Sequence, residues 1–131
     1  MNDATSTLAD LRHLVRQFVR ERQWEKFHAP KNLAMSLAIE AAELMEHFQW
    51  ISAEESRRAS RDPVRQPAIA EELADVVCYA LALANEMEID LAATVAAKMR
   101  KNEQKYPVAE FRGRYGPEDC GEAGSASHPG N

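Results

Sequence analysis

The chain has 131 residues, two cysteines and a formal net charge of −5, with a pI near 5.4. This length supports one small domain, and an acidic chain without a large basic surface argues against a nucleic-acid polymer as the main partner. No apolar run approaches the ~18 residues that predict a membrane span, and nothing resembles a secretory signal, so we expect a cytoplasmic protein without a membrane segment.

The first predicted helix begins near Thr7, whose side chain can cap it. Its apolar residues recur at helical spacing, and its arginines fall mostly on the other side, which we interpret as a solvated face. The pattern degrades after Trp24, and Pro30 is expected to end it. The segment Trp24-Glu25-Lys26-Phe27-His28 is a mixed aromatic and polar stretch at a helix end or loop.

The second predicted helix runs from Asn32 to Ile51 and is apolar nearly all round. Such a helix is buried on most sides, and three short neighbours are too few to cover it, so we expect an oligomer. One narrow polar stripe interrupts the apolar surface. It consists of Ser36, Glu40, Glu43 and His47.

The third predicted helix, Ala68 to Met87, follows a loop or hinge that is marked by Asp62-Pro63 and Gln66-Pro67. One stripe of this helix carries Glu72, Asp75 and Tyr79. Cys78 sits among apolar neighbours, so we expect it to be a buried free thiol.

The fourth predicted helix, Leu91 to Tyr106, is capped by Asp90 and stopped by Pro107. Beyond Gly113 the composition turns to Gly, Ser, Pro and acids. We therefore predict an all-α, four-helix domain over residues 1–112 and a flexible tail over residues 113–131.

Two carboxylate pairs, Glu40-x-x-Glu43 and Glu72-x-x-Asp75, lie in otherwise apolar stretches. Positions i and i+3 share one helix face, so the two carboxylates of each pair project from the same side of their helix. Four carboxylates aimed into a bundle interior repel one another and lose hydration, and a hard divalent cation compensates both effects. The sequence therefore predicts a metal site such as Mg²⁺, whereas zinc is disfavoured because no Cys/His cluster has ligand spacing.

Cations and aromatic residues supply further candidate contacts. Lys98, Asn102 and Lys105 share one face of the fourth helix and are able to bind phosphate oxygens, although ordinary surface lysines give the same pattern. A nucleobase stacked on an aromatic ring gains ~1–3 kcal/mol, although aromatics at helix ends also serve simple packing. The candidate aromatic and imidazole rings are Trp24, Phe27, His28, Trp50 and Tyr79.

These motifs resemble the all-α nucleoside triphosphate pyrophosphohydrolases of the MazG-like superfamily, and most closely the dCTP pyrophosphatase branch. The resemblance covers about Leu8 to Pro107. Its carriers are the two carboxylate pairs together with Trp24-Glu-x-Phe27-His28-x-Pro30-x-Asn32-Leu33, Phe48-Gln-Trp50, Glu71-Glu-Leu-x-Asp75-Val and Lys98-Met-x-x-Asn102-x-x-x-Tyr106-Pro107.

The resemblance implies a Mg²⁺-dependent hydrolase that cleaves a (deoxy)nucleoside triphosphate between the α and β phosphates. It also implies dimers or tetramers with shared sites, and a role in cleansing the nucleotide pool. Glu43 or its neighbour Glu40 would activate the attacking water. The implied metal ligands are Glu40, Glu43, Glu72 and Asp75, and the implied substrate contacts are Trp24, Glu25, Lys26, Phe27, His28, Trp50, Tyr79, Lys98, Asn102 and Lys105.

One position departs from the branch, because a nucleotide-contacting histidine on its first helix aligns with Val15 here. Selectivity for cytosine is therefore less well supported than the reaction. Two alternatives stay open at this point. One is a non-catalytic nucleotide sensor or interaction module, and the other is a di-iron carboxylate bundle, for which Glu25-x-x-His28 is the only Glu-x-x-His pair in the chain.

Overall fold

The structure is a computed structural model, and it describes residues 1–114, in which all regular secondary structure is helical. The chain divides into two compact units, Met1–Leu91 and Ala92–Asn131. This division falls where the fourth long helix begins, and the predicted domain of residues 1–112 stays a prediction. The predicted tail lies outside the described residues from position 115 onward.

The first helix, α1, spans Leu8–Glu21 and begins where the sequence predicted. The hydroxyl of Thr7 accepts a hydrogen bond from the backbone N–H of Asp10 at 3.1 Å, and the Asp10 carboxylate accepts one from the Thr7 N–H at 2.7 Å. This reciprocal capping box satisfies two of the orphan donors of the helix end. The hydrogen bonds from the Thr7 backbone and hydroxyl hold the pKa of Asp10 below its usual value.

The expected ends of the second helix were wrong at both sides. Pro30 does not end the first helix but is the first residue of α2, Pro30–Glu46, where its missing N–H has no partner to lose. Between the two helices lies a short 3-10 turn, η1, Glu25–Phe27. At the other end, α2 gives way to turns over residues 47–51, because Ser52 must be extended to cap the next helix.

That next helix, α3, spans Ala53–Arg58 and is followed by the 3-10 turn η2, Ala59–Arg61. The long helix α4, Arg65–Glu86, then begins three residues earlier than predicted. The carboxylate of Asp62 accepts hydrogen bonds from the N–H groups of Val64 and Arg65 at 2.9 and 3.0 Å. Pro67 therefore lies in the first turn of α4, where a proline is tolerated, and does not mark a loop.

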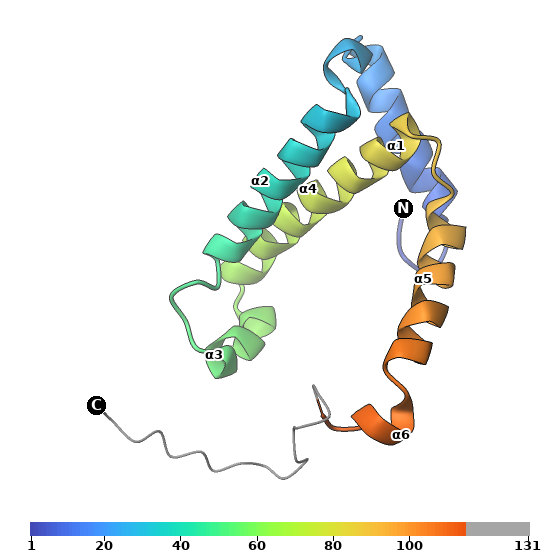
Figure 1. Ribbon diagram of the computed structural model, residues 1–131. Coiled ribbons are helices and arrows are strands. Elements are labelled where there is room, and N and C mark those ends of the chain that lie inside the picture. The colour runs from blue at the N-terminus through green and yellow to red at the C-terminus, as the bar shows by residue number, and fades with distance from the viewer. Residues whose placement is uncertain (115–131) are drawn as a thin grey trace. The chain divides into compact units, whose positions relative to one another are not determined.

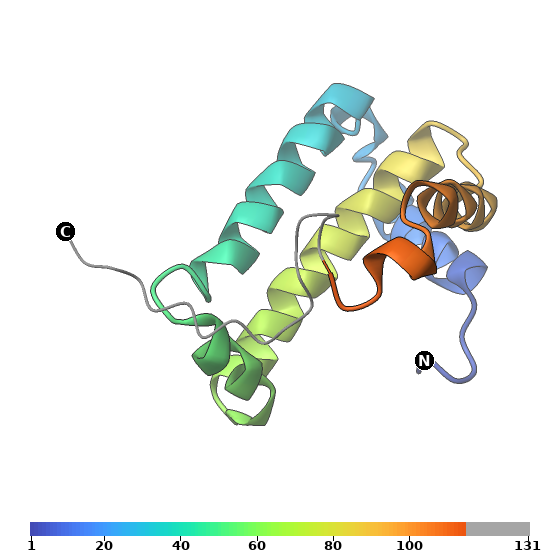
Figure 2. The ribbon, with the colours of Figure 1, turned by 60° about the horizontal axis from the view of Figure 1, so that its bottom comes forward.

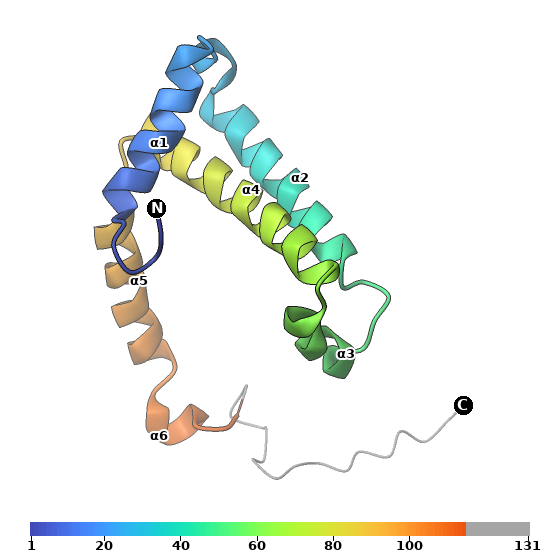
Figure 3. The same ribbon diagram turned by 180° about the vertical axis from the view of Figure 1, so that it is seen from behind.

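Helices α2 and α4 lie side by side and make the most extensive pairing in the first unit (Figures 1 and 3). Leu33 of α2 is 2% exposed, and Leu81, Ala82 and Ala84 of α4 are also buried. Burial of a leucine side chain stabilises the fold by about 1.5–3 kcal/mol. The remaining long helix of this unit, α1, contacts α4, and both views in Figures 2 and 3 show it beside the C-terminal part of α4.

The expectation that the second helix is buried on most sides is not met within one chain. Met35, Ile39 and Met45 of α2 are each more than half exposed. On α4, Leu73 and Val77 are likewise 51% and 42% exposed. The single chain therefore leaves apolar surface of both α2 and α4 uncovered. We call this helix pair the hairpin.

The second unit contains α5, Leu91–Lys105, and the short α6, Val108–Phe111. Pro107 stops α5 as predicted and also serves as the N-cap of α6. The rings of Tyr106 and Phe111 meet edge to face at 5.2 Å between centroids, which links the two helices. Among the described residues, no helix is long and apolar enough to cross a membrane.

Candidate metal centre and adjacent cavity

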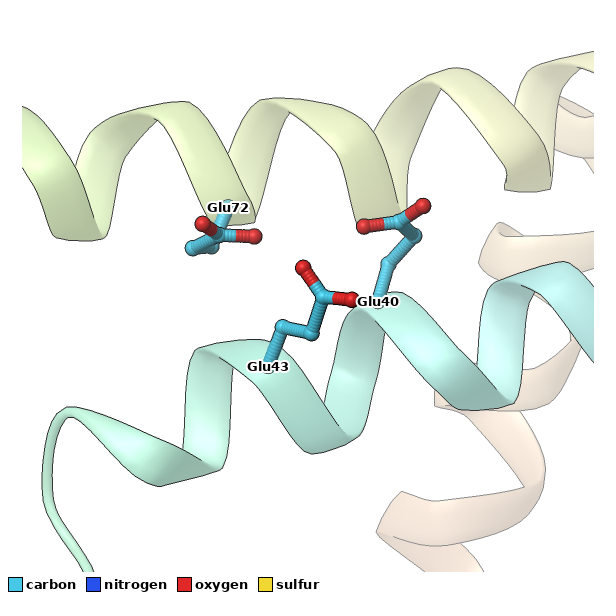
Figure 4. Close-up of side chains that lie close together, drawn as sticks. All are labelled: Glu40, Glu43 and Glu72. Carbon is cyan, nitrogen blue, oxygen red and sulfur yellow. The ribbon is translucent and has the colours of Figure 1, made fainter.

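The acidic stripes of α2 and α4 meet between the two helices. One oxygen each from Glu40, Glu43 and Glu72 lies within 4.8 Å of the other two, and Figure 4 shows the three carboxylates turned toward one another. Glu40 and Glu43 come from successive turns of α2, whereas Glu72 comes from α4. The side-by-side packing of the hairpin therefore converges carboxylates that are distant in the sequence.

This acidic cluster is electrostatically unfavourable by itself. The pKa of Glu40 is raised, first by burial and then by the neighbouring charges of Glu43, Asp75 and Glu72. No ion pair among residues 1–114 includes any of these four acids. Like charges held together without a protein cation call for a cation from solution.

The donor chemistry of the cluster fits a hard divalent cation. All three oxygens belong to carboxylates, the ligands that Mg²⁺ prefers, and no cysteine or histidine belongs to the cluster. The predicted metal ligands Glu40, Glu43 and Glu72 are thus brought together in the described part of the chain. The Glu25-x-x-His28 pair lies in and after η1 and outside this cluster, so it lends no support to a di-iron site.

Asp75, the fourth predicted ligand, connects the cluster to a cavity. It is close enough to Glu40 to raise the pKa of that carboxyl, and it also lines a cavity of about 460 Å³ between α1 and α4. The lining is mostly apolar and aromatic, with few polar groups. It consists of Leu14, Val15, Phe18, Val19, Trp24, His28, Asp75, Cys78, Tyr79 and Ala82.

Three of the predicted ring contacts line this cavity, namely Trp24, His28 and Tyr79. The ring of Trp24 meets Phe18 edge to face at 5.8 Å between centroids, so its orientation is fixed by a neighbour from α1. Phe27 does not line the cavity and is 57% exposed, with the ammonium of Lys26 4.9 Å from its ring centroid. The adjacent Glu25, like Lys26, is exposed and outside the lining.

Trp50 lies away from the cavity within one chain. It follows the C-terminal end of α2, whereas Trp24 precedes the N-terminal end of the same helix, and it is 87% exposed. A helix of 17 residues separates the two ends by about 25 Å. One chain therefore does not gather both tryptophans around one pocket.

The expectation that Cys78 is a buried thiol was wrong. Cys78 is exposed and lines the cavity, where partial burial and the charge of Asp75 raise the pKa of its thiol. Sequence analysis also missed the wall that α1 contributes. Its apolar stripe was visible in the sequence, but the stripe alone indicates packing and does not indicate a cavity. The α1 wall consists of Leu14, Val15, Phe18 and Val19.

The predicted phosphate contacts lie on α5 in the second unit. Lys98 and Lys105 are exposed, and the ammonium of Lys105 lies 5.1 Å from the Tyr106 ring centroid. Asn102 is half-buried, and its amide is 3.9 Å from the sulfur of Met99. Their predicted role at the phosphates stays a prediction.

The fold and the site define a class of protein, namely an all-helical protein with an acidic cluster between two paired helices. Comparison of the sequence with known proteins gives its family. Residues 35–115 match the MazG-like family, and the chain belongs to that family. It is 45% identical to dCTP pyrophosphatase 1 of Rattus norvegicus over 107 residues and 43% identical to that of Homo sapiens over 102 residues.

The chain spans less than two thirds of these relatives. The matches cover 82% and 78% of this chain but only 63% and 60% of the rat and human proteins. Among solved structures, a pyrophosphatase from Archaeoglobus fulgidus is 41% identical, with a TM-score of 0.72 over 82% of this chain and 98% of that one.

Proposed function

We propose that the protein is a Mg²⁺-dependent pyrophosphohydrolase that cleaves a (deoxy)nucleoside triphosphate to the monophosphate and pyrophosphate. The observation that carries this proposal is the convergence of Glu40, Glu43 and Glu72 beside a largely apolar cavity. Asp75 belongs to both features, so a molecule with a ring at one end and phosphates at the other fits the arrangement. The names of the relatives, pyrophosphatase and dCTP pyrophosphatase 1, support the same reaction.

The acids of the hairpin would hold the ion and activate water. Mg²⁺, when bound there, would supply positive charge for the phosphate oxygens and for activation of a water molecule. Glu40, Glu43, Glu72 and Asp75 are the proposed ligands, and Glu43 or Glu40 accepts the proton that the water gives up. Lys98 and Lys105 then stabilise charge on the phosphates, and Asn102 donates a hydrogen bond to them.

The cavity would take the nucleobase. Its volume of about 460 Å³ lies within the ~300–1,000 Å³ of ordinary ligand pockets. Trp24 and Tyr79 supply stacking surfaces, and His28 is the imidazole of the lining. Because Val15 presents an aliphatic side chain, the α1 wall selects the base by shape. By analogy with the relatives we propose dCTP or a modified dCTP as substrate, and cleansing of the nucleotide pool as the role.

We also propose a homodimer or homotetramer. The exposed apolar residues of α2 and α4 are surface that a second copy would cover. Trp50, which is 87% exposed and remote from its own cavity, is then free to reach the cavity of another copy. Glu25, Lys26 and Phe27 lie outside the cavity lining and would contact the parts of the substrate that project from it. The cytoplasmic location stays a prediction.

The test is pyrophosphate release from a panel of dNTPs and NTPs, each with Mg²⁺ and with excess chelator. Metal-dependent release with the monophosphate as co-product is the expected result, with dCTP or a 5-substituted dCTP turned over fastest. Release that persists in chelator contradicts the role of the acids. Nucleotide binding without turnover on any substrate favours the non-catalytic sensor instead.

A further inference from the structure

One guanidinium fastens α1 to the C-terminal end of α4. Arg12 donates a hydrogen bond from Nε to the side-chain oxygen of Asn85 at 2.9 Å. Its two terminal nitrogens donate to the backbone carbonyls of Ile89 at 2.8 Å and Ala84 at 3.2 Å. All three contacts span more than 70 residues of sequence, so they are tertiary and do not merely extend a helix.

The carbonyls that Arg12 contacts belong to the last turn of α4, at Ala84, and to the capping segment that follows it, at Ile89. Glu88 has a φ of 51°, and the N–H of Ile89 returns to the carbonyl of Ala84 at 2.9 Å, which forms a C-terminal cap. The last carbonyls of a helix carry partial negative charge, so a guanidinium there is stabilised by the helix dipole. Arg12 thus binds α4 at the point where its charge is most favourable.

Asn85 closes the contact from the other side. Its amide donates to the backbone carbonyl of Arg12 at 3.0 Å, while its oxygen also accepts a hydrogen bond from Arg16 at 3.1 Å. Both Arg12 and Asn85 are half-buried, so these hydrogen bonds are partly shielded from water. Arg12 and Asn85, which we call the latch, therefore hold the two helices together reciprocally.

The other end of α1 is joined to the turn that follows it. The N–H of Trp24 donates to the carbonyl of Val19 at 3.0 Å, Val19 is buried, and Phe18 meets the Trp24 ring. Between these ends α1 faces the cavity, and Leu14 and Phe18 remain 53% and 47% exposed. Direct packing in this part of α1 is therefore sparse, and side-chain hydrogen bonds join α1 to α4 at the latch.

We infer that Arg12 is a positioning residue for the cavity, which sets the position of the α1 wall through the latch without touching the bound molecule. Leu14 and Val15 lie within one helical turn of Arg12, so loss of the latch lets this part of the wall move first. For its effect on substrate affinity the inference rests on the proposed function. Its effect on α1 itself does not.

The test compares Arg12→Met, which keeps an unbranched apolar stem, with Arg12→Lys, which keeps the charge but not the fork. Arg20→Met is the matched control, because Arg20 is an exposed arginine of the same helix outside the cavity lining. For R12M we expect KM to rise about 10-fold with kcat within about twofold, because a displaced wall weakens binding of the base in ground and transition states alike. R12K should be intermediate, and R20M should match the parent chain.

Two readouts do not require turnover. Amide hydrogen exchange of Leu8–Glu21 should accelerate in R12M, while exchange in the α2–α4 hairpin stays unchanged. The affinity of an apolar dye such as anilinonaphthalene sulfonate for the cavity should fall in the same variant. If the parent chain hydrolyses no nucleotide, the proposed function fails, and these two measurements still decide the latch.

Asn85→Ala supplies a second route if R12M does not fold. We expect N85A to shift KM and α1 exchange in the same direction, and the double variant R12M/N85A to be less than additive. Equal α1 exchange and equal dye affinity in R12M, R12K, R20M and the parent chain would overturn the inference. So would a fall in kcat at constant KM, because a displaced binding wall does not produce it.

Discussion

The two seams of α4 are built from different chemistry. Against α2 it makes its most extensive packing, and this packing brings together acids that repel one another. Against α1 it is held by a polar latch at one end and encloses a cavity in between. The α2–α4 contact, which we call the rigid seam, thus positions charge for an ion. The α1–α4 contact, which we call the looser seam, leaves room for a ring.

The largest expected effect comes from the rigid seam. In Glu43→Gln we expect turnover to fall by about 10³-fold or more, because one amide replaces a charged ligand and candidate base. Steady-state pyrophosphate release checks this, with Glu46→Gln as control because Glu46 lies on the same helix outside the cluster. A variant that turns over normally and keeps its metal dependence would remove the acids from the mechanism.

The looser seam should respond in affinity. Trp24→Ala removes a stacking surface worth ~1–3 kcal/mol, so we expect KM to rise about 5- to 150-fold with a smaller change in kcat. Trp24→Phe, which keeps an aromatic ring, should recover most of the loss. An unchanged KM in Trp24→Ala would mean that the base binds elsewhere.

Metal should stabilise the folded chain through the acids of the rigid seam. At 100 times its dissociation constant, Mg²⁺ should stabilise the folded chain by about 2.7 kcal/mol, because it binds the gathered carboxylates and not the unfolded chain. Thermal unfolding with Mg²⁺ and with chelator measures the difference. The shift should shrink in Glu43→Gln and Glu72→Gln but persist in Trp24→Ala, and equal shifts in all three variants would contradict an ion at the acids.

The smallest expected effect concerns the start of α1. Because the folded pKa of Asp10 is lowered, its capping bonds contribute stability above the ordinary aspartate pKa and lose it as pH falls through the lowered value. Asp10→Asn should therefore unfold at a lower temperature than the parent chain near pH 7, and the gap should close in acid. A gap that stays constant with pH would point to a cause other than the charge.

Local signals in the sequence were sufficient to predict the four long helices, though not all of their ends, and the helix faces that carry the acids. Thr7 caps α1 as predicted, and the period of Glu40 and Glu43 placed them on one face. The meeting of these residues with Glu72 followed from apolar flanks that had to pack together.

The cavity was beyond such signals. Whether the stripe with Leu14 and Phe18 packs tightly or stands off depends on the latch between Arg12 and Asn85, which are separated by 73 positions. The position of Trp50 likewise depended on where α2 stops, which Ser52 decides through the cap of the following helix. Sequence periodicity carries no information about either tertiary choice.

All five methionines of the chain are more than half exposed: Met1, Met35, Met45, Met87 and Met99. Peroxide converts an accessible thioether to a polar sulfoxide. The extent of oxidation of each methionine therefore shows whether its side chain is covered. Met35 and Met45, on the uncovered surface of α2, would resist oxidation once another copy sealed that surface, whereas Met1 serves as an internal reference. Oxidative stress would then harm newly made, unassembled chains first, since a sulfoxide on that surface hinders the association that would have protected it.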